Sequence, residues 1–192
     1  MYAETENAFQ TVVRECKELF LRKAEDYGGS WRLFRFPSLT DQIFIKARRI
    51  RQLEEMADGP AIPESAEEEY RGIFNYAVMA LMRLWYAEDL PEVDLTERTF
   101  VRLLAAKLAA VYGRVLDRLL DLMRRKNHDY GEAWRAMRVS SITDQVLVRV
   151  WRLKQLEDNR GHASISEGID ANYADIANYC VFALIRLGEG KE

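Results

Sequence analysis

Apolar residues recur at intervals of three and four along most of the chain, which is the spacing of amphipathic α-helices. The first such segment ends near Tyr27, where Gly28 is suited to a left-handed C-cap. The same spacing predicts five further helices, over residues 38–57, 65–87, 95–128, 142–159 and 166–187. No segment shows the alternation of a half-buried strand. The pattern therefore predicts an all-α fold.

The two halves of the chain repeat one another. The segment DYGGSWR from Asp26 returns as DYGEAWR from Asp129, an offset of 103 residues, and SLTDQ from Ser38 returns as SITDQ. Without a gap, residues 13–84 match residues 116–187 at 28 of 72 positions, whereas composition alone gives roughly one identity in fifteen or twenty. We therefore predict one domain, a six-helix bundle of two pseudosymmetric three-helix repeats, residues 1–87 and 96–192, joined by a linker at 88–95.

Composition narrows the class of protein. The chain has 192 residues, of which 48% are hydrophobic, and a net charge of −3, which is typical of a globular protein with a proper core. It has no apolar run long enough to span a membrane and no secretory signal, so we expect a cytoplasmic protein without a membrane partner. A pI of about 5.6 argues against general duplex-DNA binding. Cys16 and Cys180 are expected to be reduced core residues.

A first polar cluster is identical in the two halves and lies at the end of the first helix of each repeat. As a functional cluster, its lysines would hold phosphate, its aspartates a metal or a sugar hydroxyl, and its aromatic rings would stack on a base. As a structural cluster, its members would cap the helix and fill the bend below it. The residues are Lys23, Asp26, Tyr27 and Trp31 in the first half, and Lys126, Asp129, Tyr130 and Trp134 in the second.

A second cluster lies on the second helix of each repeat. Gln145, Arg149 and Arg152 share one stripe, as do Gln42, Lys46 and Arg49, and such a stripe suits a triphosphate held with a divalent cation. The neighbouring acids are Asp41 and Glu54 in the first half and Asp144 and Glu157 in the second. The plain alternative is that the two aspartates occupy the third position of a capping box and that the charges form surface ion pairs.

A third cluster lies on the last helix of each repeat. Asp175, Asn178 and Tyr179 project from one face, and Asn75 corresponds to Asn178. Gly72 stands where the second half has Asp175, so only one of the two equivalent sites has an acid at that position. An asparagine inside an apolar helix needs partners. A structural alternative is that Asn75 and Asn178 pair with each other across the pseudo-two-fold axis.

The K-x-x-D-Y-G-x-x-W, T-D-Q and D-x-x-N-Y patterns of this duplicated chain resemble the family called nucleotide modification associated domain 1. The resemblance implies a role near nucleotide metabolism or DNA base modification. A looser similarity is to the MazG-like all-α nucleoside triphosphate pyrophosphatases, which bind magnesium through E-x-x-E and E-x-x-D motifs. Asp175-x-x-Asn178 is similar to the second of these motifs with an amide in place of one acid, and the E-x-x-E motif is missing at the corresponding helix.

The sequence thus leads to a nucleotide-binding protein that acts on a nucleoside phosphate as a metal-dependent pyrophosphohydrolase. In this hypothesis Asp144, Asp175 and Asn178 hold Mg²⁺, and Asp144, Asp175 and Glu157 are catalytic. Substrate would be bound by the first-cluster residues above together with Gln145, Arg149, Arg152, Asn75, Asn178 and Tyr179. The alternative is a non-catalytic accessory module of a nucleotide-modification system. Whether the chain forms homo-oligomers stays open at this point.

Overall fold

The computed structural model describes residues 2–56, 65–90, 101–159 and 168–190, and within these ranges it holds helices and no strand. The all-α prediction is confirmed, with three main helices in each repeat. The helices are α1 (Ala3–Tyr27), α2 (Phe36–Glu55), α3 (Ala66–Trp85), α4 (Val101–Tyr130), α5 (Val139–Asp158) and α6 (Ile169–Glu189). The predicted loops at 58–63 and 160–165, and residues 91–95 of the predicted linker, lie outside the described residues.

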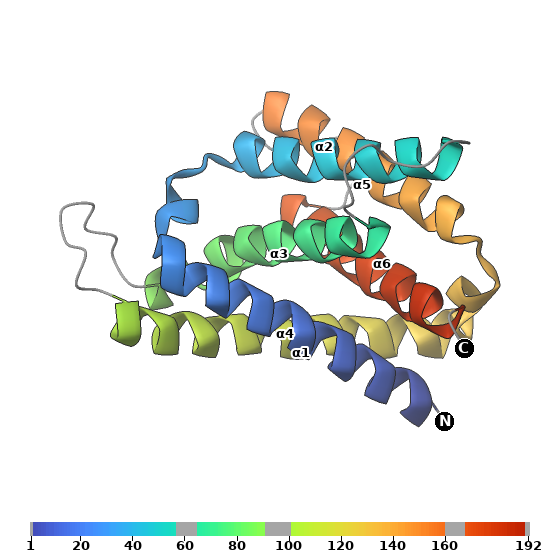
Figure 1. Cartoon of the computed structure of the whole chain (residues 1–192), viewed down its shortest axis with the longest axis horizontal. Helices are drawn as coiled ribbons and strands as arrows, with labels where there is room; N and C mark the ends of the chain where they lie inside the picture. The colour runs from blue at the N-terminus through green and yellow to red at the C-terminus, as the bar shows by residue number, and fades with distance from the viewer. Residues whose placement is uncertain (1, 57–64, 91–100, 160–167, 191–192) are drawn as a thin grey trace.

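Equivalent helices of the two repeats pair in three layers (Figure 1). Helices α2 and α5 form one outer layer, α3 and α6 the middle layer, and α1 and α4 the other outer layer. The middle layer is apolar almost all round, as a helix covered on both sides must be. In α6 every residue from Asn172 to Ile185 except Tyr179 is buried. The core therefore belongs to both repeats jointly.

The end of the first helix is built alike in both repeats. Gly28 and Gly131 each take a φ of +60°, a conformation that costs a residue with a Cβ atom much more than glycine. A short 3₁₀ helix follows each bend and places one tryptophan, Trp31 or Trp134, in the core. The predicted end of the first helix at Tyr27 is confirmed. Gly28 is its C-cap residue and its N–H donates to the carbonyl oxygen of Ala24 at 2.9 Å, but its ψ of −144° lies outside the predicted left-handed helical conformation.

The predicted capping boxes of the second helices are wrong. Helix α2 begins at Phe36 with Pro37 in its first turn, where a missing N–H is harmless, and α5 begins at Val139. Asp41 and Asp144 therefore lie past the third position of their helices, and neither N-cap residue forms a side-chain cap. Both aspartates are exposed and face the other repeat, where they contact Lys154 and Arg51 respectively.

Two matching hydroxyl networks connect the repeats across the α2–α5 and middle layers. Thr40 donates to Glu157 Oε1 at 2.6 Å, and its Oγ1 lies 2.7 Å from the hydroxyl of Tyr173. In the equivalent network, Thr143 donates to Glu54 at 2.6 Å and its Oγ1 lies 2.6 Å from the hydroxyl of Tyr70. Both threonines and both tyrosines are buried.

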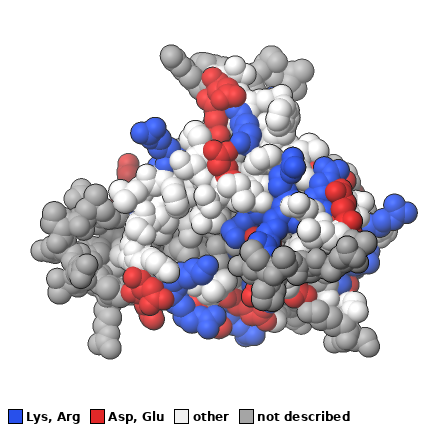
Figure 2. Space-filling model, turned by 45° about the horizontal axis from the view of Figure 1, so that its top comes forward, with Lys and Arg blue, Asp and Glu red and all other residues white. Residues whose placement is uncertain are grey.

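The outer surface carries mixed charge. On the face seen in Figure 2, basic and acidic side chains are interspersed around a broad uncharged area. Among the described helices, none is long and apolar enough to cross a membrane. Cys16 and Cys180 are buried and unbonded, and burial raises the pKa of the Cys16 thiol to about 12, so both behave as core residues.

Candidate functional site: one pocket in each repeat

Each repeat encloses a pocket between its own three helices. The repeat-1 pocket has a volume of about 290 Å³ and the repeat-2 pocket about 370 Å³. The repeat-1 pocket is lined by Leu19, Phe20, Lys23, Lys46, Glu68, Glu69, Arg71, Gly72, Asn75, Tyr76 and Met79. The repeat-2 pocket is lined by Lys126, Asn127, Tyr130, Ala133, Trp134, Met137, Arg149, Asp175, Asn178, Tyr179 and Phe182. Six positions correspond at the 103-residue offset, so the two pockets are versions of one site.

A buried carboxylate lies between two cations in the repeat-2 pocket. The side chain of Asp175 is only 4% exposed, and its Oδ2 is 3.0 Å from a guanidinium nitrogen of Arg149. Its Oδ1 accepts a hydrogen bond from the ammonium group of Lys126. Burial of this acid is tolerated because both oxygens have charged donors. The three groups together carry one excess positive charge at the pocket wall.

In the repeat-1 pocket the buried carboxylate comes from a position about one helical turn earlier than that of Asp175. Glu69, on α3, is 2.9 Å from Lys46 and 3.3 Å from Arg49, and its side chain is 4% exposed. A Cβ atom on Gly72 would stand 2.9 Å from the Lys46 side chain, so that lysine runs through the space where Asp175 stands in repeat 2. The first repeat thus keeps an acid for its cations, three residues before the position that corresponds to Asp175.

Asn75 and Asn178 do not pair with each other, which corrects that structural alternative. Asn75 donates to the carbonyl oxygen of Cys16 at 3.2 Å and accepts from the hydroxyl of Tyr112 at 2.6 Å. Asn178 is 3% exposed, yet within the described part of the chain neither its Oδ1 nor its Nδ2 has a hydrogen-bond partner. Each asparagine faces the pocket of its own repeat.

Aromatic and apolar side chains also line the repeat-2 pocket. The rings of Trp134 and Phe182 stack with centroids 4.4 Å apart and an angle of 6° between their planes. Tyr130, also a lining residue, is 74% exposed. In repeat 1, Trp31 packs edge-on against Phe20 at 6.2 Å and does not line the pocket. In the described structure, stacked aromatic rings and cations therefore line one pocket in the second repeat, and the guanidinium of Arg135 lies 4.6 Å from the centroid of the Trp134 ring.

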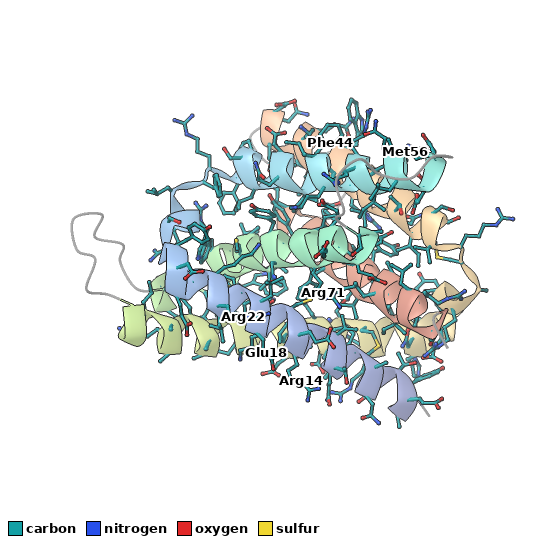
Figure 3. All side chains as sticks on the ribbon, viewed as in Figure 1. Arg14, Glu18, Arg22, Phe44, Met56 and Arg71 are labelled. Atoms are coloured by element: carbon teal, nitrogen blue, oxygen red, sulfur yellow. The ribbon has the colours of Figure 1, made fainter. Side chains whose placement is uncertain are left out.

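The repeat-1 pocket carries a further ion pair. Arg71, from α3, lies between α3 and α1 in Figure 3 and is 3.1 Å from the carboxylate of Glu15. Alanine stands at the corresponding position of the second repeat, Ala174. Figure 3 also shows Arg14, Glu18 and Arg22 following one another along α1, and all three are exposed. Arg14, Glu18 and Arg22 do not line the pocket, but five charged residues do, against three in the repeat-2 pocket, so charged groups occupy the first pocket more fully.

The residues predicted to hold Mg²⁺ do not lie together. Asp175 and Asn178 line the repeat-2 pocket, whereas Asp144 is exposed on α5 and its carboxylate is 3.4 Å from Arg51. Glu157 accepts hydrogen bonds from Thr40 and Tyr173 at the junction between the repeats. In the described ranges, no three histidine, cysteine, aspartate or glutamate side chains gather as metal ligands. Because the carboxylate of Asp175 already faces two cations, the donor set does not fit a divalent ion.

The remaining predicted site residues divide between the pockets and the surface. Lys23 lines the repeat-1 pocket, and Lys126, Tyr130, Trp134, Arg149, Asn178 and Tyr179 line the repeat-2 pocket. Asp26 and Tyr27 are exposed, Gln145 and Arg152 are partly exposed, and none of the four lines either pocket. Asp129 is exposed and lies 3.1 Å from its neighbour His128.

Sequence reasoning missed three residues that shape the pockets. Glu69 belongs to an acidic run that looks like the charged start of a helix, although its spacing of three from Gly72 places it on the pocket face. Tyr112 and Asn127 have no identical counterpart, since Phe9 and Ala24 stand at the equivalent positions. Comparing the two halves for identity alone could not reveal them.

Fold and pockets together define a class: a tandem-repeat helical protein with one small-molecule-sized pocket in each repeat. The sequence model of the family nucleotide modification associated domain 1 matches residues 23–84 and again residues 126–187. The two matches are separated by the same offset as the internal repeat and cover most of the chain, so the protein belongs to this family. Neither the curated proteins nor the solved structures gave a match.

Proposed function

We propose that the chain is a binding module for a nucleoside phosphate, acting in nucleotide metabolism or base modification, and that the repeat-2 pocket is its binding site. The observation that carries this proposal is the combination, in one pocket, of two cations around a single buried acid with a flat aromatic wall. Phosphate oxygens accept hydrogen bonds from lysine and arginine, and aromatic faces stack on bases. The family's association with nucleotide modification supports the same ligand class.

Binding without hydrolysis follows better from this geometry than the pyrophosphohydrolase mechanism. That mechanism needs several carboxylates around one ion to activate water. Here Asp144 and Glu157 have partners away from the pocket, and Asp175 faces Lys126 and Arg149. The role of Asp175 in this proposal is to hold the two cations in place so that they receive the phosphate.

Calorimetric titration with ribo- and deoxyribonucleoside mono- and triphosphates, including modified bases, tests the proposal. Each titration is run with and without Mg²⁺ or Mn²⁺, and the products are separated by chromatography and mass spectrometry. We expect saturable binding with the nucleotide recovered unchanged. Lys126→Ala should weaken binding by about ten- to a hundredfold, since it removes a charged hydrogen bond.

Lys23→Ala is the matched control, because it removes the equivalent lysine from the repeat-1 pocket. It should leave the affinity unchanged. Release of a monophosphate and pyrophosphate would show that the protein is an enzyme and would contradict the proposal of binding without hydrolysis. Absence of binding across the whole panel would overturn the proposal and leave the polar clusters as purely structural groups.

A further inference from the structure

The amide of Asn178 lies in the repeat-2 pocket and takes no part in the proposed phosphate contacts. Both of its polar atoms are buried and, among the described residues, lack a hydrogen-bond partner. A buried amide without partners destabilises a fold, and such groups are rare in native proteins. Since the pocket lies directly beside it, a ligand entering that pocket can supply the missing donor and acceptor.

Comparison of the repeats shows why this amide is unsatisfied. Asn75, in the repeat-1 pocket, accepts a hydrogen bond from the hydroxyl of Tyr112, which lies on α4 of the other repeat. The residue that corresponds to Tyr112 at the 103-residue offset is Phe9, buried on α1. Phenylalanine keeps the ring but has no hydroxyl to donate. The presence of one hydroxyl group, on Tyr112 and not on Phe9, thus decides whether the asparagine is bonded inside the protein or available to a ligand.

We infer that Asn178 binds the edge of a nucleobase, and that the chain has one such base site, in repeat 2. This inference rests on the proposed function and adds the group that recognises the base. A carboxamide presents a donor beside an acceptor and pairs in bidentate fashion with a base edge that offers the complementary pair. The stacked rings of Trp134 and Phe182 provide the apolar wall alongside. Lys126 and Arg149, which line the same pocket, meet the phosphate.

The size of the pocket agrees with such a ligand. Its volume of about 370 Å³ is near the lower end of the roughly 300–1,000 Å³ range of small-molecule sites. A base with its sugar and one phosphate is a ligand of this size class. The repeat-1 pocket is smaller, at about 290 Å³, and both polar atoms of its asparagine are already bonded.

The test compares ligands with and without a base. The four deoxynucleoside 5′-monophosphates are titrated into the full chain, with deoxyribose 5-phosphate as the probe that has sugar and phosphate only. We expect at least one nucleotide to bind more tightly than deoxyribose 5-phosphate, with one site per chain. Asn178→Ala should remove this preference, lowering nucleotide affinity by about tenfold while leaving deoxyribose 5-phosphate unaffected.

A second variant adds the missing hydroxyl instead of removing the amide. Phe9→Tyr places a tyrosine on α1 at the position equivalent to Tyr112 on α4, so Asn178 should gain an internal partner and the nucleotide should bind less tightly. Asn75→Ala is the matched control, expected to lower stability without changing affinity, because its amide is bonded inside the protein.

The outcomes separate the two proposals. Equal affinity for nucleotides and deoxyribose 5-phosphate in the unmodified chain would overturn the base contact and leave phosphate binding intact. The base contact is likewise overturned if Asn178→Ala and Phe9→Tyr both fold and keep the full preference. If neither kind of probe binds, the proposed function fails together with the inference.

Discussion

At the scale of single residues, the two repeats have an asparagine at the same position with different hydrogen bonding. Asn75 has two partners and Asn178 has none in the described structure, although both are buried at equivalent positions of equivalent helices. The difference arises on another helix, from Tyr112 in one case and Phe9 in the other. Identity at a position therefore does not establish identity of role.

This difference predicts opposite effects of one substitution on stability. Asn178→Leu should leave the free energy of unfolding unchanged or raise it, because it removes an unsatisfied amide from an apolar setting. Asn75→Leu should lower it by about 1–3 kcal/mol, because the buried Tyr112 hydroxyl loses its acceptor. Urea unfolding followed by circular dichroism measures both. Equal destabilisation by the two variants would contradict the assignment of partners.

A second residue-scale prediction concerns pH. Desolvation raises the pKa of Glu157 above its ordinary value of 4.5, and this outweighs the hydrogen bonds from Thr40 and Tyr173 that lower it. Since the folded state then holds the proton more tightly than the unfolded state, this group stabilises the fold fully below about pH 4.5. That contribution is lost as the pH rises through the raised pKa.

Glu157→Gln keeps an acceptor for Thr40 and removes the titration. The free energy of unfolding, measured from about pH 4 to pH 7, should fall less with rising pH in this variant than in the unmodified chain. Glu54, whose pKa is likewise raised by desolvation, should behave alike when replaced by glutamine. An unchanged pH profile in both variants would show that neither carboxylate is coupled to folding.

At the scale of helices, the pocket acid occupies alternative positions one turn apart. Repeat 1 has Glu69 followed by Gly72, and repeat 2 has Asn172 followed by Asp175. In both cases the acid pairs with the cation from the second helix, Lys46 or Arg149. Both repeats therefore keep an ion pair between their second and third helices, although the acid stands at different positions.

Exchanging the two arrangements tests this interpretation. Glu69→Asn should lower the free energy of unfolding by about 1–3 kcal/mol, because Lys46 and Arg49 lose a buried acceptor. Adding Gly72→Asp should recover much of the loss, since the end of the Lys46 side chain is flexible and able to turn toward the new carboxylate. Thermal and urea unfolding measure the recovery. A double variant less stable than Glu69→Asn would refute it.

The helix ends give a further comparison between glycines. Gly28 has open space around its missing Cβ but a φ of +60°, so Gly28→Ala should destabilise by backbone strain alone, about 1–3 kcal/mol. Gly188 also has open space and lies within α6 without such a φ. Gly188→Ala should raise stability by up to about 1 kcal/mol through helix propensity. Thermal unfolding of the two variants should therefore shift in opposite directions.

The sequence predicts the helices and the repeat well because helical periodicity and duplication are local or fixed-offset signals. It also identifies Lys126, Arg149, Asp175 and Asn178 as candidates, all of which line one pocket. It fails for Asp144 and Glu157, since the face of a helix that meets its own pocket and the face that meets the other repeat look alike in sequence. Only the packing of α2 against α5 separates them.

At the scale of the whole molecule, the halves share a core and two hydroxyl networks while each keeps its own pocket. Tyr70→Phe and Tyr173→Phe each remove a buried hydroxyl that bonds a threonine of the opposite repeat. Each should lower the free energy of unfolding by about 0.5–1.5 kcal/mol, and by similar amounts. Tyr27→Phe, at a 72% exposed position, should change it by less than about 0.5 kcal/mol. Urea unfolding of the three variants measures these changes, and an equal effect of all three would contradict the role of the buried hydroxyls.

The placement of each pocket inside a single repeat has a consequence for how this chain can evolve. The two pockets share no lining residue, so substitutions in one lining leave the other lining unchanged and the two copies can diverge in ligand chemistry. The position of Tyr112 and Phe9 is an exception, because Tyr112 of the second repeat bonds Asn75 in the pocket of the first. The threonine–tyrosine contacts impose the opposite constraint, because each joins a residue of one copy to a residue of the other. Substitutions in the pocket linings are therefore less constrained than substitutions at the junction, where each hydroxyl contact needs a residue from both repeats.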